Sequence, residues 1–214
     1  MTTQLTITNG ALGFLGERSL VTTADATEPA RTMAAFYAPA VRYCLEQGHW
    51  KFAERRVVLT PSLTEIPTFG RANAFAHPTD YVRVNALCSD ERFSMPVSDI
   101  EDVGAFWYCD LDKLYLKYVS NDTNYGLNLA LWPETFTLFV ELYLATLASS
   151  RIAPNKKPDT IQAPGGIGLI DAKRNALAKD AVAGPTQFLP TGRWAGRRFR
   201  NRNNRNSSTT LYGN

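Results

Sequence analysis

Hydrophobic residues follow a helical spacing near both ends of the chain and a strand-like alternation in its middle. A first helix is predicted over residues 4–15, with Leu12 and Leu15 on its apolar side and Gly16 just after its end. A second, longer helix is predicted to follow and to stop at Gly48.

The second helix has a start signal and a continuous apolar face. Asp25 and Glu28 have the spacing of a capping box, and Pro29 suits a first helical turn. The expected apolar face consists of Ala30, Met33, Ala34, Tyr37, Val41, Cys44 and Leu45.

The middle section, from about residue 55 to residue 120, is typical of short strands. Four runs rich in Val, Tyr and Phe are separated by Pro, Gly, Asn and Asp; they are RRVVLTP, YVRVNAL, AFWYC and LYLKYV. In the last run Leu114, Leu116 and Tyr118 share one face, while Tyr115 and Lys117 take the other. This section therefore predicts a small antiparallel sheet.

Helical periodicity returns at Pro133 and again over about residues 169–183. In the first of these helices, Ala145 and Ala148 are expected to allow close approach of a helix from a neighbouring subunit. The order of elements predicts an α+β fold, a helical bundle with an inserted small antiparallel β subdomain and an extended C-terminal arm. The expected bounds are 1–54 and 130–192 for the bundle, 55–129 for the β subdomain and 193–214 for the arm.

Charge is divided unevenly along the 214 residues. The formal net charge is +3, but residues 193–214 hold 6 of the 23 Lys and Arg and none of the 20 Asp and Glu. The remainder therefore has 17 basic and 20 acidic groups, a net charge of −3. This asymmetry indicates a basic tail that meets an acidic partner, either protein or nucleic acid.

Few patterns favour catalysis or a bound cofactor. Neither His49 nor His77 has a metal-ligand companion at a useful spacing, so a structural or surface role is expected for both. Asp110 and Asp112 alternate like calcium ligands, but the rest of a calcium loop is missing, which favours a solvated turn. No strand is visible before the stretch at residues 165–168, and no further glycine completes the GxGxxG spacing of a phosphate-binding loop. We expect no catalytic residue, no metal and no cofactor.

The three cysteines, Cys44, Cys88 and Cys109, show no CxxC spacing, which fits free thiols in a reducing compartment. No signal peptide is expected after Met1. No run of about 18 apolar residues predicts a membrane span.

Aromatic residues stand at the predicted junctions between elements. Trp50 and Phe52 follow the second helix, and Trp132 precedes the late helix. Together with Trp107 they could form a binding platform, but burial in the core is the favoured interpretation. We expect Trp50 and Phe52 to fasten the second helix to the sheet, and Trp132 to be structural as well.

Four segments, taken in order, resemble the head-to-tail adaptor of short-tailed bacteriophages, also called tail tubular protein A. They are ALGFLGE with the helix that follows it, GHWKFAERRVVL, HPTDYVRV with its Pro-x-Asp-x-x-Arg pattern, and LWPETFTLFVELYLATLASSRI. RWAGRRF, at residues 193–199, also resembles the closing Trp-x-x-Arg of the family. The segments cover most of residues 5–198, and the chain departs from the pattern beyond Phe199.

The resemblance implies a structural virion protein of the viral tail, made in the host cytoplasm. Subunits of this family form a dodecameric ring below the portal vertex and present a docking face to the tail nozzle. The implied partners are the portal protein, the nozzle protein and copies of the same chain, with no membrane. DNA passes through the lumen during ejection without specific binding, and a mildly acidic lumen would let it slide.

The arm is the predicted portal-binding segment. Its composition cannot bury enough apolar surface to fold alone, so it is expected to order on the portal. Its arginines can form forked bonds to carboxylates, while its aromatic and aliphatic side chains supply apolar anchors. The candidate residues are Arg193, Trp194, Arg197, Arg198, Phe199, Arg200, Arg202, Arg205, Leu211 and Tyr212.

Three alternatives remain open at this point. The first is a nucleic-acid-binding protein that uses the same tail, since Asn, Arg and aromatic residues suit single strands or RNA. The second is a tail that only adds solubility. The third is a small enzyme, which the missing catalytic arrangement disfavours.

Overall fold

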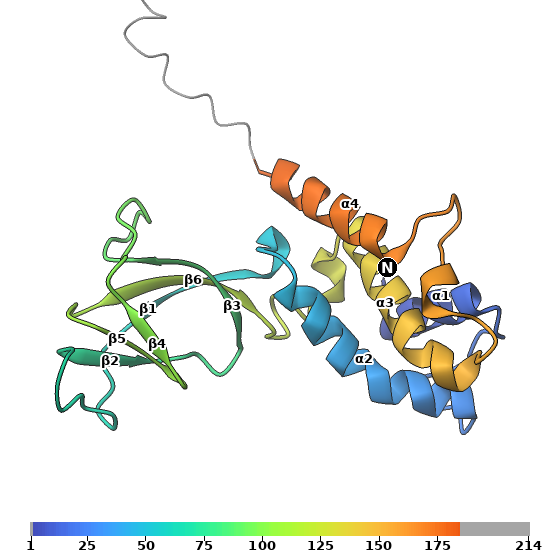
Figure 1. Cartoon of the computed structure of the whole chain (residues 1–214), viewed down its shortest axis with the longest axis horizontal. Coiled ribbons are helices and arrows are strands. Elements are labelled where there is room, and N and C mark those ends of the chain that lie inside the picture. The colour runs from blue at the N-terminus through green and yellow to red at the C-terminus, as the bar shows by residue number, and fades with distance from the viewer. Residues whose placement is uncertain (1, 185–214) are drawn as a thin grey trace, which may run out of the picture. The chain divides into compact units, whose positions relative to one another are not determined.

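The computed structural model describes residues 2–184. Four helices pack together, and two three-stranded antiparallel sheets are inserted between α2 and α3 in the sequence, which confirms the predicted α+β class (Figure 1). No helix in this part of the chain is both long and apolar enough to cross a membrane. The helices are α1 (Gln4–Leu15), α2 (Glu28–Glu46), α3 (Glu134–Ile152) and α4 (Leu169–Val182).

The end of α1 follows the sequence signal. Gly16 adopts the left-handed conformation, with φ of 79°. The backbone N–H of Gly16 donates to the carbonyl of Gly13, and the N–H of Glu17 donates to the carbonyl of Leu12, each at 3.0 Å. These bonds satisfy carbonyls that would otherwise be left free at the helix end, so the glycine fixes where α1 stops.

The start of α2 differs from the prediction. Its N-cap is Thr27, whose hydroxyl accepts a hydrogen bond from the amide of Ala30 at 3.4 Å. The predicted capping box of Asp25 and Glu28 is wrong, because the Asp25 carboxylate accepts bonds from backbone amides in the turn before the helix. Ala34 was expected on the apolar face and is exposed.

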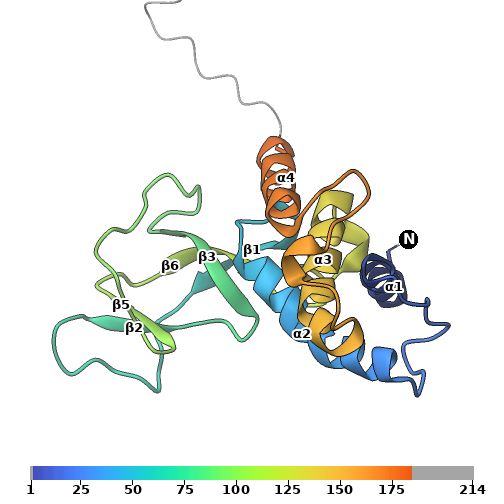
Figure 2. The same ribbon diagram turned by 45° about the vertical axis from the view of Figure 1, so that its right-hand side comes forward.

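α3 is the central helix of the bundle, since α1, α2 and α4 all pack against it (Figures 1 and 2). Its aromatic residues Phe136 and Phe139 lie in this core. Ala145 and Ala148, expected to face a neighbouring subunit, are both 0% exposed. The predicted close packing of helices at these small residues is confirmed, but the partners are helices of the same chain, so the expected contact with a neighbouring subunit is wrong.

The middle section folds into two sheets, where the sequence pattern predicts one. The sheet orders are β1-β6-β3 and β2-β5-β4, with all neighbours antiparallel. β2 and β4 escape the sequence pattern because they are short, with 4 and 3 residues, and contain no run of Val, Tyr or Phe. The strands are β1 (Glu54–Leu59), β2 (Asn73–Ala76), β3 (Tyr81–Cys88), β4 (Glu101–Val103), β5 (Phe106–Cys109) and β6 (Leu114–Ser120).

β6 divides its side chains between two hydrophobic cores. Leu114, Leu116 and Tyr118 share one face, as predicted, and lie with Trp107 in a core between the two sheets. Val119 belongs to the helical core instead. The alternation of the strand therefore links the two cores through a single element.

Candidate functional site

The carboxylate of Asp80 joins strands of the first sheet. It accepts hydrogen bonds from the Arg55 guanidinium at 2.8 Å, from the Tyr118 hydroxyl at 2.9 Å and from the Ser120 hydroxyl. Burial raises the pKa of Asp80, but the bonds from Ser120, Arg55 and Tyr118 more than offset this, so the pKa lies below its ordinary value. An ionised Asp80 therefore fastens β1 and β6 to the turn before β3.

Arg83, in the same Pro-x-Asp-x-x-Arg segment, connects the first sheet to the helices. Its Nη1 donates to the backbone carbonyl of Glu46, at 2.9 Å. Glu46 ends α2, where helix carbonyls lack partners of their own and attract cations. Nearby, His49 Nδ1 lies 2.6 Å from Asn85 Oδ1 in β3. The segment thus holds the β part to α2, a role that the local sequence pattern does not reveal.

The three aromatic residues predicted as structural meet around one ring of α3. Trp50 and Phe52 each lie 4.8 Å from Phe136 between ring centroids, and Trp132 lies 4.9 Å from it. Each indole N–H donates to a backbone carbonyl, at 3.0 Å for Trp50 and 2.8 Å for Trp132. Both indoles are almost fully buried. They therefore offer no platform for a ligand.

The three cysteines are buried and His77 is half-buried. Within residues 2–184, no group of three His, Cys, Asp or Glu side chains is placed to hold a metal ion. Burial lowers the pKa of His77, whose ring lies against that of Trp107 at a tilt of 36°, with 3.8 Å between ring centroids. Burial also raises the pKa of the free thiols, so none of them is an activated nucleophile. The thiols are those of Cys44, Cys88 and Cys109.

An exposed apolar loop joins β1 to β2. Leu63, Ile66 and Phe69 are 93%, 72% and 88% exposed. At the start of the loop, the amide of Ser62 donates to the carbonyl of Ala74 at 2.7 Å, which holds the backbone to β2. Three large, exposed apolar side chains within seven residues make this loop a candidate for a protein contact.

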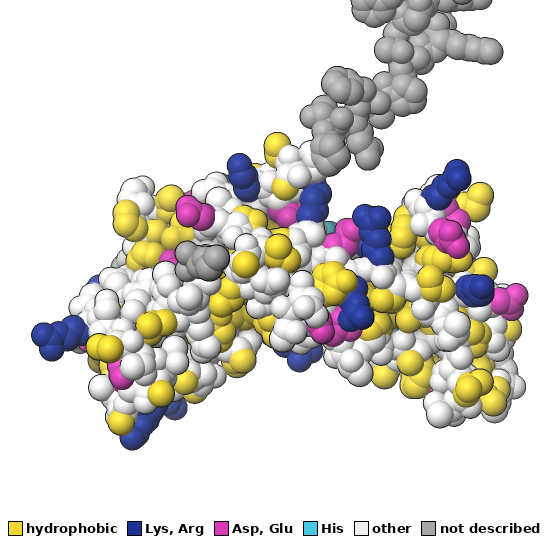
Figure 3. All heavy atoms as spheres, turned by 180° about the vertical axis from the view of Figure 1, so that it is seen from behind, with side chains coloured by type: hydrophobic (Ala, Val, Ile, Leu, Met, Phe, Trp, Pro, Cys, Tyr) yellow, Lys and Arg dark blue, Asp and Glu magenta, His cyan; other side chains and the backbone are white. Residues whose placement is uncertain are grey.

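This apolar loop, residues 60–72, has an acidic border. At its end Arg71 pairs with Asp99, with Glu101 at 3.1 Å and with Asp110 at 3.3 Å. Asp110, expected in a solvated turn, thus serves as a partner of Arg71 and also accepts a backbone amide at 2.8 Å. Residues 89–112 contain seven acidic residues and one basic residue. On the molecular face shown in Figure 3, apolar and charged side chains are interspersed.

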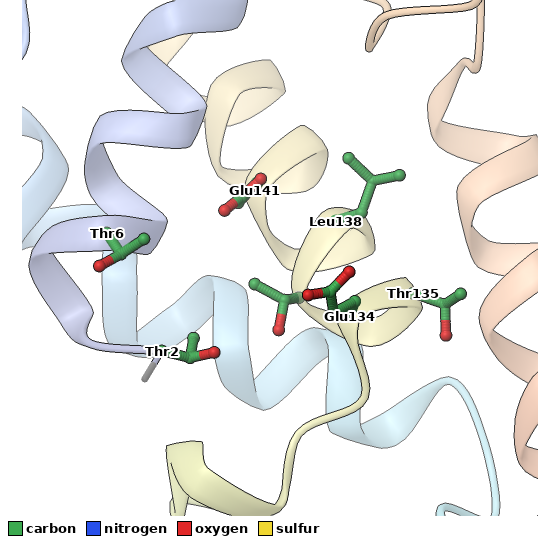
Figure 4. A pocket seen from close by; sticks show the side chains of 7 residues that line it. Thr2, Thr6, Glu134, Thr135, Leu138 and Glu141 are labelled. Atoms are coloured by element: carbon green, nitrogen blue, oxygen red, sulfur yellow. The ribbon is translucent and has the colours of Figure 1, made fainter.

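A cavity of about 460 Å³ lies between the amino-terminal segment and α3. Glu134 and Glu141 project from α3, and Thr2 and Thr6 line the other side (Figure 4). The two carboxylates are seven residues apart on one helix, about 10.5 Å along its axis. The cavity therefore presents two acidic side chains, one in the first turn of α3 and one about two turns further along.

The predicted portal-binding residues, from Arg193 to Tyr212, lie outside the described residues, and their role stays a prediction. Asp80 and Arg83 belong to the Pro-x-Asp-x-x-Arg pattern quoted above for the resemblance, and the structure adds their role at the junction. The structure also adds Leu63 and Phe69 in the exposed loop, because loop residues of this kind leave no periodic signal in the sequence. Among known proteins, no family model matches the chain, and no curated protein is significantly similar to it in sequence.

Proposed function

We propose that this protein is a ring-forming head-to-tail adaptor of a short-tailed bacteriophage, a structural virion component that joins the portal to the tail nozzle. DNA would pass through its lumen. The main support is that the segments resembling this family contain the residues that connect the parts of the fold. Asp80 fastens the first sheet and Arg83 ties it to α2. Trp50 and Trp132 meet at Phe136. Because the resembling segments contain these contacts, the resemblance favours a fold shared with the adaptor family.

The surface chemistry also favours a protein that works through contacts. Leu63 and Phe69 are more than four-fifths exposed on a loop that is anchored at its base. Burial of these side chains in an assembly would remove their apolar surface from water, which favours a contact at this loop. The loop is a candidate for one of the contacts that an adaptor must make.

The arm, residues 193–214, is proposed to attach the ring to the portal. Ion pairs at a protein surface contribute little individually, so the apolar anchors must supply much of the affinity of one arm. Several arms around a ring bind together, and this multivalency makes the attachment firm.

The proposal is tested by mixing the purified full-length protein with the portal protein of the same virus and imaging the mixture by negative-stain electron microscopy. We expect an added ring on the portal. Deleting residues 193–214 should leave the protein folded, as judged by circular dichroism, but abolish stable attachment. Deleting only 201–214 should weaken attachment partly, because Trp194 and Phe199 remain. Attachment of the full deletion at undiminished affinity would refute the role of the arm.

The same variants decide between the adaptor and the nucleic-acid-binding alternative, which six arginines without an acidic residue in the arm favour. Binding to phosphates weakens steeply as salt rises, whereas an arm anchored by apolar side chains keeps part of its affinity. If the full deletion loses only salt-sensitive DNA binding and the intact protein never binds the portal, the nucleic-acid function replaces the adaptor.

A further inference from the structure

The carboxyl group of Glu141 in α3 lies against the backbone of α1 at Gly10. A β-carbon at residue 10 would lie 2.5 Å from the carboxyl carbon of Glu141, and 2.6 and 2.7 Å from its oxygens. Such distances are shorter than any van der Waals contact, so the glycine makes room for the carboxyl group. Figure 4 shows the Glu141 side chain directed towards the α1 side of the cavity.

α1 offers this carboxyl group no counter-charge. The helix sequence QLTITNGALGFL contains no Asp, Glu, Lys, Arg or His. Among the described residues that line the cavity, the other charged side chain is that of Glu134, which is also acidic. Burial raises the pKa of Glu141 to about 7, with no neighbouring charge contributing. The contact between α1 and α3 is therefore made most easily when Glu141 is neutral.

We infer that docking of α1 onto α3 is coupled to the uptake of one proton by Glu141, so that this helix contact tightens in mild acid and loosens above neutral pH. When α1 is docked, the carboxyl group lies against Gly10. When α1 detaches, the carboxyl group returns to water and ionises as an ordinary glutamate. Docking is thereby linked to proton binding by mass action.

The sign and the size of the effect follow from this linkage. The stabilisation of the docked helix is complete below the ordinary pKa of 4.5, declines as the pH rises, and is lost above about 7. The two pKa values limit the change in the opening of α1 to roughly 300-fold. Because water reaches the carboxyl group through the open cavity, we expect a change of about 10- to 100-fold. Ile7 and Leu12 of α1 are buried independently of Glu141, so we expect α1 to stay mostly docked at any pH in this range.

Hydrogen exchange of the full-length protein tests the inference. Exchange of peptides from α1 and α2 is followed by mass spectrometry between pH 5 and pH 8, after correction for the intrinsic pH dependence of exchange. We expect protection of α1 to fall about 10- to 100-fold relative to α2 as the pH rises. In Glu141→Gln, which is neutral at every pH, the ratio of α1 to α2 protection should stay constant.

One further test variant, Gly10→Ala, and two matched controls, Glu134→Gln and Gly13→Ala, separate this effect from a general loss of stability. Glu134→Gln removes the exposed carboxylate of the same cavity and should leave the pH dependence of α1 intact. Gly10→Ala should displace the Glu141 carboxyl group and reduce the pH dependence. Gly13→Ala, where an added β-carbon meets nothing within 4 Å, should not change it. A constant ratio in the wild type, or an unchanged pH dependence in Glu141→Gln, would overturn the inference.

Discussion

Replacing Asp80 with asparagine is expected to destabilise the protein by about 3 kcal/mol. The substitution keeps the shape of the side chain but removes the charge that faces the Arg55 guanidinium at 2.8 Å. It also replaces one acceptor oxygen by an NH₂ group. In the wild type, the hydroxyl groups of Tyr118 and Ser120 donate to the carboxylate, so an NH₂ group beside them meets donors and no acceptor. Removing one partner of a fully buried ion pair costs about 3–5 kcal/mol, and this pair is only partly buried. The lower end applies because the Arg55 side chain is 35% exposed.

Urea denaturation followed by circular dichroism measures this loss, with Tyr118→Phe as the matched variant. Tyr118→Phe removes one donor to the ionised Asp80 and should cost about 1.5–3 kcal/mol, the range for a hydrogen bond to a charged group. In a double-mutant cycle the two changes should be coupled, because both act on the same carboxylate. Additive losses would show that the hydroxyl and carboxylate do not interact in solution.

The pH dependence gives an independent check on Asp80. Its pKa lies below the ordinary value, so the stabilisation is present at neutral pH and is lost as the pH falls through the pKa of the folded state. Asp80→Asn should therefore approach the wild type in stability only in acid. If the asparagine variant lies within about 0.5 kcal/mol of the wild type at pH 7, the ion pair does not hold the sheet together and this reasoning fails.

Three further predictions concern packing and assembly. Trp50→Ala should cost about 3–5 kcal/mol in urea denaturation, and a variant with normal stability that fails to assemble would place Trp50 at an interface instead. Gly126→Ala should cost at least about 1–3 kcal/mol, because its β-carbon would lie 2.1 Å from the carbonyl oxygen of Ser120; a melting temperature equal to that of the wild type would contradict this. Replacing Leu63 and Phe69 by serine should leave stability unchanged but weaken binding to an assembly partner in sedimentation, and unaltered binding would exclude the loop as a contact.

Local signals in the sequence were sufficient for the positions of the helices and the longer strands. Gly16 stops α1 because it alone adopts the left-handed conformation there without strain. The alternation of Leu114, Leu116 and Tyr118 places β6 with the correct face towards the sheet core. These features depend on a few neighbouring residues, which is why periodicity and end signals find them.

Tertiary contacts decided what each of these surfaces meets. The small residues Ala145 and Ala148 suit close packing, but whether their partner is the same chain or another depends on where α1, α2 and α4 lie. Both Thr27 and Asp25 have side chains that can cap a helix. Thr27 caps α2 because the carboxylate of Asp25 already accepts a backbone amide in the preceding turn. A short sequence pattern contains no information that distinguishes such competing partners.

The two carboxylates with the clearest physical roles are also products of the tertiary structure. Asp80 gathers donors that are 25 to 40 residues away in the sequence, and Glu141 lies against a glycine on another helix. Each role depends on which groups lie close to the carboxylate in space, on how far it is buried, and on whether its neighbours carry charge or donate hydrogen bonds. The sequence alone determined the fold class and the charge asymmetry of the arm, because composition and periodicity are properties of the chain. Burial of a particular charge is a property of the folded arrangement, and only the structure reveals it.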